Sequence, residues 1–336
     1  MSARHQPGLS DLLTGWLRDA VPSLGSPLRY DRLPGGRSNL TYLVSGPSGR
    51  AVVRRPPLGA HPGNAHDVLR EARLLSGLAG AVPVPAVLAT CEDTSVLDAP
   101  FAVLEFLDGL VVREPSDVPA AVASIGPSLV DTLAALHAVD PERVGLGGLV
   151  SRKDHLSRQL ARWFGNWRRT SIRPLPALER AHDVLVRHVP PQLRTAIVHG
   201  DYRLDNCVLT PEGEVRGVLD WELTTVGDPL ADLGQLLVYW AEPGDTDTAL
   251  HTPPTVVPGF ATRSELLERY ARSGASVAGV EYHVAFNWWK TACIVENVYT
   301  RVKSGDLGAT DRSPDSFAAQ AERLADRAWR EASALR

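Results

Sequence analysis

The sequence predicts an α+β protein of two lobes, with a small antiparallel sheet in the N-terminal lobe and a mainly helical C-terminal lobe. Strand-like runs and turns alternate between residues 29 and 106, whereas helical periodicity dominates after the turn at Asp108-Gly109. The chain has 336 residues, and single hydrophobic cores stop growing near about 250–300 residues. We therefore expect one lobe over residues 1–107 and a second over 108–336.

The composition is that of an ordinary globular protein. Hydrophobic residues make up 44% and charged residues 22%, and the formal net charge is -4. Without a long basic run, no nucleic acid or membrane partner is indicated, and a small-molecule ligand is expected. The N-terminus lacks the apolar core of a signal peptide, and no stretch reaches the roughly 18 apolar residues of a membrane span, so we expect a cytoplasmic protein. The sequence predicts unpaired thiols at Cys91, Cys207 and Cys293.

The elements of the N-terminal lobe follow from local patterns. Apolar residues at helical spacing predict a short helix over 9–17, and alternating runs separated by glycine-rich turns predict three antiparallel strands over 29–54. A helix is predicted over 68–78, and further strands over 86–90 and 102–106.

The C-terminal lobe is predicted to be helical around a single β-rich island. Apolar residues at helical spacing begin at Val122 and Leu156, and the island covers 197–219. Proline, glycine and polar residues predict a loop over 242–259. Four further helices are predicted over 230–240, 264–272, 280–301 and 316–334.

The island predicts an antiparallel hairpin with polar residues at its open end. Two short apolar strands, Cys207–Leu209 and Val215–Leu219, flank the turn at 210–214. Asn206 enters this hairpin and Asp220 leaves it, so their side chains should meet at the same end. An amide oxygen beside a carboxylate suits Mg²⁺, which takes one or two protein ligands and completes its shell with phosphates and water.

Asp201 lies five residues before Asn206 on the same loop. It would then reach the terminal phosphate of a bound nucleotide, where a hydroxyl nucleophile must be oriented. Asp and Asn also cap purely structural turns. The joint occurrence of His-Gly-Asp, the five-residue offset and the Asp220-Trp221-Glu222 segment favours a functional site.

This pattern resembles the aminoglycoside phosphotransferase family over nearly the whole chain, and especially its branch related to domains fused to acyl-CoA dehydrogenases. The resemblance implies a protein-kinase-like fold that binds ATP between its lobes. It implies that Asp201 accepts the proton of the substrate hydroxyl, while Asn206 and Asp220 hold Mg²⁺. Arg203 stands where protein kinases have a catalytic-loop lysine and would contact the transferred phosphoryl group, and His199 would brace the loop.

A segment downstream also looks like the family. In Gly227–Gly234, Pro229 is expected at the first position of a helix with Asp228 as its cap. Asp232 is expected to reach back to the catalytic loop.

The nucleotide-binding residues of the N-terminal lobe are assigned by their place in the family. Ser38 and Asn39 would belong to the phosphate-covering loop, although an ordinary hairpin loop explains the same residues. Arg54 stands where kinases have a lysine, with Glu71 as its partner on the following helix; the alternative is an exposed arginine and a solvated glutamate. Glu105 and Leu107 would lie at the adenine-binding hinge, and a plain strand ending in a turn is the alternative.

The predicted reaction is transfer of the γ-phosphoryl group of ATP, with GTP not excluded, to a hydroxyl of a small molecule with the help of Mg²⁺. Asp245 and Asp247 make no dense acidic patch, so a hydroxylated metabolite or acyl compound is favoured over a polycationic aminoglycoside. Two alternatives remain: a nucleotide-binding pseudokinase, since the lysine is missing, and a metal-dependent phosphohydrolase. The sequence indicates no oligomeric state.

Overall fold

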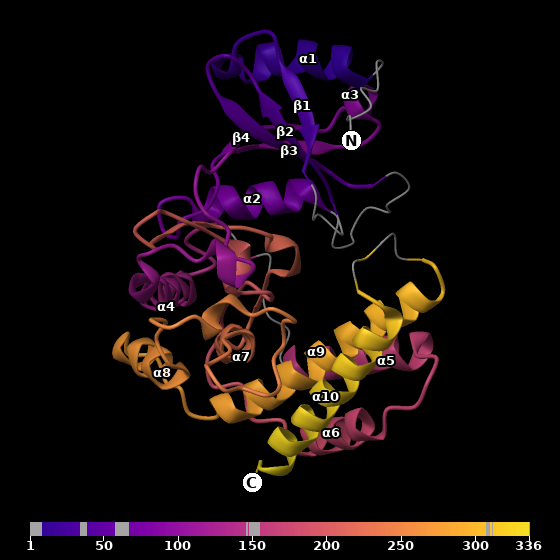
Figure 1. Ribbon diagram of the computed structural model, residues 1–336. Coiled ribbons are helices and arrows are strands. Elements are labelled where there is room, and N and C mark those ends of the chain that lie inside the picture. The colour runs from indigo at the N-terminus through magenta and orange to yellow at the C-terminus, as the bar shows by residue number, and fades with distance from the viewer. Residues whose placement is uncertain are drawn as a thin grey trace.

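The computed structural model describes residues 9–33, 39–57, 67–145, 147, 155–306, 310 and 312–335. A sheet lobe that carries the N-terminal helix is stacked on a larger helical lobe (Figure 1). This arrangement confirms the predicted bilobal α+β fold, while the boundary at residue 107 stays a prediction. None of the described helices is both long enough and apolar enough to cross a membrane.

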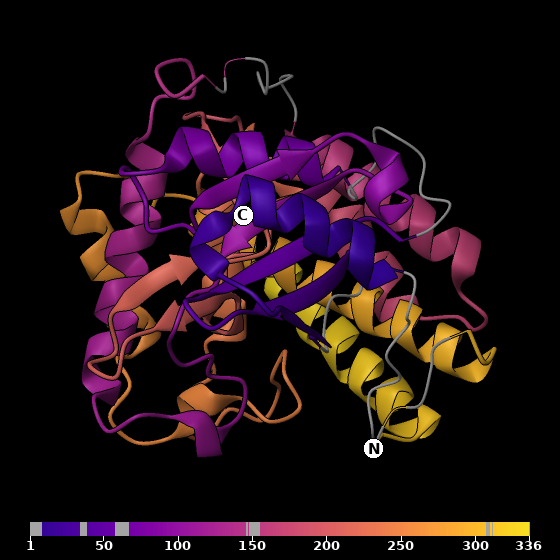
Figure 2. The same cartoon turned by 90° about the horizontal axis from the view of Figure 1, so that it is seen from above.

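The small lobe is built on one antiparallel sheet in the order β1-β2-β3-β5-β4. Its strands are β1 (Arg29–Arg32), β2 (Leu40–Ser45), β3 (Arg50–Arg55), β4 (Val87–Cys91) and β5 (Phe101–Glu105). Helix α1 (Leu9–Ala20) lies over this sheet (Figure 2), and the short α3 (Thr94–Leu97) packs against α1. Ala51 and Val53 of β3 are fully buried in a core shared with α1. Since side chains alternate along a strand, Arg54 projects from the opposite face, toward Glu71.

Helix α2 (Val68–Leu78) joins the two lobes. It begins at the cap residue Asp67, whose carboxylate accepts a hydrogen bond from the Arg70 backbone at 2.9 Å. Leu75 and Leu78 belong to a core that also contains Trp221 of the large lobe. The Arg70 guanidinium donates to the Thr224 carbonyl at 2.6 Å. Helix α2 is therefore fixed against the segment that follows the predicted catalytic hairpin.

The large lobe consists mainly of packed helices. They are α4 (Val122–Ala138), α5 (His155–Thr170), α6 (Pro176–Arg187), α7 (Leu230–Tyr239), α8 (Arg263–Arg272), α9 (Val280–Lys303) and α10 (Pro314–Ser333). Helices α9 and α10 lie side by side (Figure 1). Trp288 and Trp289 are buried in the core between α5, α6, α9 and α10. Sequence reasoning missed α6, although Pro176 in its first turn and apolar residues at helical spacing signal it.

Two short strand pairs lie between the helices. β7 (Cys207–Leu209) pairs with β8 (Val215–Val218), which confirms the predicted hairpin. β6 (Ala196–Val198) pairs with β9 (Thr225–Gly227), a strand that was not predicted. Leu110 and Leu209 exchange two backbone hydrogen bonds of 2.8 Å, so the chain leaving the small lobe is attached to the hairpin. The three cysteines are buried free thiols, as predicted.

Candidate active site

The hairpin brings Asn206 and Asp220 to one end, as the sequence predicts. Cys207 pairs with Val218, and the Leu219 backbone donates to the Asn206 carbonyl at 2.8 Å, one step beyond the strands. Asp220 follows in a left-handed conformation with φ of 66°, which is rare for a residue with a side chain. Its side chain is 42% exposed and therefore accessible to a ligand.

The predicted catalytic loop is fixed by Asp232 of α7. This fully buried carboxylate accepts the backbone N–H groups of His199 at 2.6 Å and Gly200 at 2.8 Å, and lies 3.4 Å from Nε2 of His137. Burial alone would raise the pKa of Asp232, but these donors and the His137 ring outweigh it and hold the pKa below its usual value. The predicted reach of Asp232 to the loop is thus confirmed.

Asp228 holds the start of α7 and contacts the His283 ring of α9. Its Oδ1 accepts the Leu230 N–H at 3.0 Å, and its Oδ2 lies 3.6 Å from the His283 ring. Pro229 takes the cap position of α7 rather than the first helical position, so the helix begins one residue later than predicted.

His199 connects the catalytic loop to the hairpin. Its ring is fully buried, with Nε2 2.9 Å from the Leu219 carbonyl and Nδ1 3.2 Å from the Asp201 N–H. Because one partner only accepts and the other only donates, the ring is a neutral imidazole protonated at Nε2. His199 thus holds the backbone of Asp201.

Three donors hold the carboxylate of Asp201. Oδ1 accepts from Nε2 of Gln235 at 2.7 Å, and Oδ2 accepts from Nδ2 of Asn206 at 3.0 Å and Nε of Arg203 at 3.3 Å. Such contacts favour a single orientation of the carboxylate. Gln235 was not predicted, because a glutamine within an apolar helix gives no catalytic signal by itself.

Arg203 lies between two carboxylates. Besides Asp201, it pairs with Oδ2 of Asp205 at 2.9 Å, and its guanidinium lies over the Tyr239 ring at 4.9 Å from the centroid. Burial opposes its charge, but Asp201 and Asp205 prevail and raise the pKa of Arg203, which keeps it cationic. Its contact with a transferred phosphoryl group stays a prediction.

Asn206 and Asp220 suit a metal ion whose remaining ligands are phosphate oxygens and water. Nδ2 of Asn206 donates to the backbone carbonyl of Asp201 at 2.8 Å and to its carboxylate, which leaves Oδ1 as the amide atom available to a cation. No group of three His, Cys, Asp or Glu side chains that could hold a metal alone occurs among the described residues. A pair that needs phosphates and water to complete the shell fits Mg²⁺ bound together with a nucleotide.

Arg54 connects this pair to the small lobe. Its Nη1 lies 2.7 Å from Oε1 of Glu71, and its Nη2 lies 3.5 Å from Oδ1 of Asp220. Glu71 is 4% exposed, and burial raises its pKa although Arg54 opposes the shift. The predicted Arg54–Glu71 pair therefore forms as a buried contact directed at Asp220, in place of an exposed arginine and a solvated glutamate.

The remaining residues that the sequence assigns to nucleotide binding lie in different surroundings. Ser38 lies outside the described residues. Asn39 is buried, and its Oδ1 has no hydrogen-bond partner among the described residues; its contact with a phosphate stays a prediction. The Glu105 carboxylate accepts the Ala86 N–H at 3.2 Å at the sheet edge. Leu107 lies against β8, where a Cβ added at Gly217 would come within 2.2 Å of its Cδ1.

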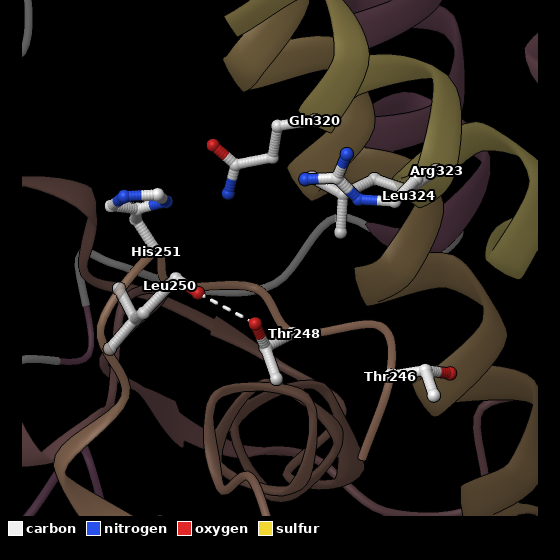
Figure 3. A pocket seen from close by; sticks show the side chains of 7 residues that line it. All are labelled: Thr246, Thr248, Leu250, His251, Gln320, Arg323 and Leu324. Carbon is white, nitrogen blue, oxygen red and sulfur yellow. Dashed lines mark hydrogen bonds between the residues drawn. The ribbon is translucent and has the colours of Figure 1, made fainter. Parts of the chain in front are cut away.

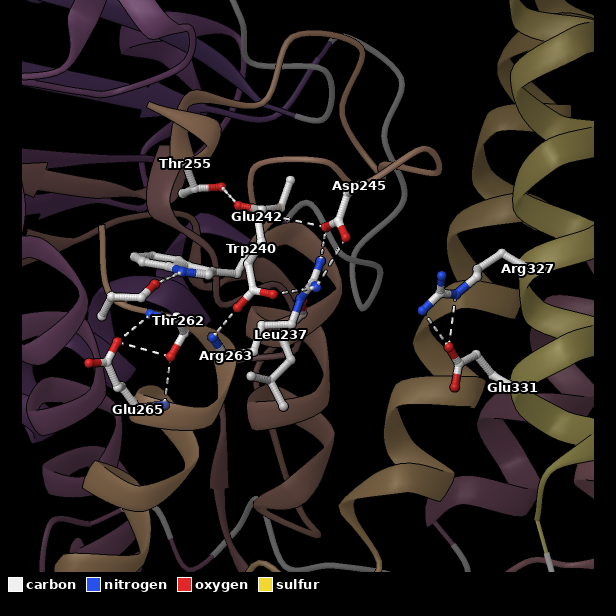
Figure 4. A network of polar contacts seen from close by, with 12 residues as sticks. Leu237, Trp240, Glu242, Asp245, Thr255, Thr262, Arg263, Glu265, Arg327 and Glu331 are labelled. Atoms are coloured by element: carbon white, nitrogen blue, oxygen red, sulfur yellow. Dashed lines mark hydrogen bonds and ion pairs between the residues drawn. The ribbon is translucent and has the colours of Figure 1, made fainter. Parts of the chain in front are cut away.

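The loop after α7 is held by ion pairs. Arg263 binds the backbone or side-chain oxygens of Leu237, Glu242 and Asp245 (Figure 4). Asp247 pairs with Arg330 of α10. Both acidic residues singled out in the sequence are therefore paired with arginines.

A small pocket lies between this loop and α10 (Figure 3). It is lined by Thr246, Thr248, Leu250, His251, Gln320, Arg323 and Leu324. The lining holds an arginine and a histidine and no acidic side chain.

The chain matches the APH phosphotransferase enzyme family over residues 29–273. The chain belongs to this family. The match includes Arg54, Asp201 and Asp220, and family membership supports phosphoryl transfer to small molecules as its class of reaction.

Individual relatives agree with this assignment. Acyl-CoA dehydrogenase family member 10 of Mus musculus is 32% identical over 96% of this chain, which spans only 31% of that protein. A crystal structure from Ralstonia eutropha, provisionally assigned as an aminoglycoside phosphotransferase, is 29% identical with a TM-score of 0.80, covering 97% of this chain and 99% of that chain. A mutant of aminoglycoside phosphotransferase APH(4)-Ia, in complex with AMP-PNP and hygromycin B, shares the fold (15% identity, TM-score 0.62, 96% and 98% coverage).

Proposed function

We propose that this protein is an ATP- and Mg²⁺-dependent phosphotransferase that moves the γ-phosphoryl group to a hydroxyl of a small molecule. The observation that carries the proposal is the convergence of Asp201, Asn206 and Asp220 with the Arg54–Glu71 pair at the end of one hairpin. These groups come from both lobes, and together they supply an oriented carboxylate, a pair of oxygen ligands and a buried guanidinium.

Each side chain has a distinct task in this reaction. Asp201 orients the acceptor hydroxyl and takes its proton, since Gln235, Asn206 and Arg203 hold its carboxylate in place. Arg54 is placed to bind nucleotide phosphates while Glu71 fixes its orientation. Mg²⁺, when bound by Asn206 and Asp220, neutralises charge on the phosphates.

The acceptor is better described as a neutral or anionic alcohol than as a polycation. Asp245 and Asp247 are paired with arginines, and the pocket beside α10 contains Arg323. A cationic aminoglycoside would require uncompensated carboxylates here. The similarity to a protein named as an acyl-CoA dehydrogenase family member favours hydroxylated acyl compounds as the first acceptors to screen.

Thermal unfolding with nucleotides tests the site without knowledge of the acceptor. Wild type, Asp220→Ala and the exposed control Asp19→Ala are unfolded with ATP, GTP or ADP, each with and without Mg²⁺. A ligand at a hundred times its dissociation constant adds about 2.7 kcal/mol to stability. We expect a Mg²⁺-dependent shift with ATP in the wild type and in Asp19→Ala, and its loss in Asp220→Ala. No shift with any nucleotide, from a folded protein, would refute the proposal.

A nucleotide-binding pseudokinase is the second candidate, because Arg54 occupies the place of the usual lysine. Guanidinium is broader than ammonium and binds phosphate in a different geometry. The two functions differ in turnover: a phosphotransferase releases ADP in proportion to the phosphorylated alcohol, whereas a pseudokinase shows the thermal shift without ADP formation.

A further inference from the structure

A lysine is buried directly beneath the catalytic loop. Lys290 of α9 is 9% exposed, and its Nζ donates to the carbonyl of Gly200 and to Oε1 of Gln235, each at 3.1 Å. No ion pair joins it to a carboxylate within the described part of the chain. Burial lowers the pKa of Lys290, while Asp201 and Asp232 act against this shift. The Nζ also lies 6.0 Å from the centroid of the Trp163 ring. A buried ammonium whose hydrogen-bond acceptors are both neutral is costly to keep, so packing alone does not account for it.

The second acceptor of Lys290 is the residue that touches the catalytic carboxylate. Gln235 is 2% exposed and bridges the two, with Oε1 toward Lys290 and Nε2 donating to Oδ1 of Asp201 at 2.7 Å. An ammonium only donates and a carboxylate only accepts, so these two neighbours permit a single orientation of the amide. Without the ammonium, the amide could rotate and set its oxygen against Asp201.

We propose that Lys290 is a positioning residue for phosphoryl transfer, which acts through Gln235 to hold the Asp201 carboxylate in its productive orientation. Its contact with the Gly200 carbonyl fixes the backbone of the same loop, one residue before the carboxylate. Asp201 is then held at Oδ1 by Gln235, which Lys290 holds in turn, and at Oδ2 by Asn206 and Arg203. This inference rests on the proposed function.

The kinetic test uses Lys290→Met, Gln235→Leu and the double variant. Methionine has a similar length and no charge, so the helix can remain packed. Lys303→Met is the matched control, since Lys303 lies exposed on the same helix. ADP release from Mg²⁺–ATP is measured, with water as acceptor unless an alcohol has been identified.

We expect kcat to fall about 100-fold in Lys290→Met, the effect of a small misplacement of a catalytic group, with KM for ATP unchanged. Lys303→Met should match the wild type. Because Lys290 acts through Gln235, the double variant should be less than about threefold slower than the slower single variant. A kcat within about threefold of wild type in Lys290→Met would overturn the proposal, as would multiplicative losses in the double variant.

A second measurement does not depend on turnover. The chain has five glutamines, so nitrogen-15 glutamine labelling gives few side-chain amide signals, and Gln235→Leu identifies the one of interest. We expect the Gln235 amide to be protected from hydrogen exchange in the wild type and exposed to exchange in Lys290→Met. Protection that persists in Lys290→Met would overturn the positioning contact. A wild type that forms no ADP would count against the proposed function, and the exchange result would still decide whether Lys290 orients Gln235.

Discussion

Replacing Asp232 by asparagine tests how the catalytic loop is held. The carboxylate is fully buried and accepts the N–H groups of His199 and Gly200. Hydrogen bonds to a charged group contribute about 1.5–3 kcal/mol each. Asparagine has one acceptor oxygen, so it keeps one contact and sets its NH₂ against the other donor. We expect Asp232→Asn to lose about 2–4 kcal/mol of unfolding free energy at pH 7.

The same substitution has a predicted pH dependence. The pKa of Asp232 is lower in the folded chain than its ordinary value of 3.8, so its stabilising contribution is complete above that value and is lost as the pH falls through the folded pKa. The stability difference between wild type and Asp232→Asn should be constant from about pH 6 to 8 and shrink below about pH 4.

Urea unfolding followed by tryptophan fluorescence at several pH values measures this difference. Asp19→Asn, at an exposed position on α1, is the control and should unfold like the wild type. Equal stability of Asp232→Asn and wild type, or a difference that grows on acidification, would refute the reasoning.

Two further substitutions test other contacts. Arg54→Met leaves the carboxylate of Glu71 buried without its ion-pair partner, so urea unfolding at pH 8 should show a loss of about 3–5 kcal/mol of unfolding free energy. The loss should be smaller at pH 5, because the pKa of Glu71 is already raised and the carboxylate can take up a proton. An equal loss at both pH values would contradict this account. Gly234→Ala places a Cβ 2.8 Å from the backbone of His283 and should destabilise the protein by about 1–3 kcal/mol. The matched helical control Gly165→Ala, with nothing within 4 Å, should be neutral or stabilising in the same assay, and equal effects at both glycines would contradict the packing argument.

The parts of the site that the sequence predicts are those set by short-range geometry. A two-stranded hairpin with a short turn brings the residues at its two ends together, so Asn206 and Asp220 meet wherever the hairpin lies. The Arg54–Glu71 pair needed the family resemblance as well, because its partners lie on a strand and a helix joined by an intervening segment.

The parts that were missed depend on how distant helices pack. Gln235 and Lys290 lie on α7 and α9, and their contact depends on the rotation of each helix and the register between them. Periodicity predicts which face of a helix is apolar, and it does not predict which polar side chain on that face finds a partner. A lysine directly after Trp288 and Trp289, within a buried helix, was the available signal. Strand β9 was missed because three residues give no usable alternation.

The most direct test of the central claim is phosphoryl transfer itself. Wild type and Asp201→Asn are incubated with Mg²⁺–ATP and a panel of hydroxylated acyl compounds and other alcohols, and ADP and phosphoester are quantified together. We predict equal amounts of both products from the wild type with at least one alcohol, and a loss of at least about 100-fold in Asp201→Asn. A folded wild type that binds Mg²⁺–ATP and forms no ADP would contradict the claim in favour of a pseudokinase, and release of phosphate from phosphoesters without ATP would indicate a phosphohydrolase.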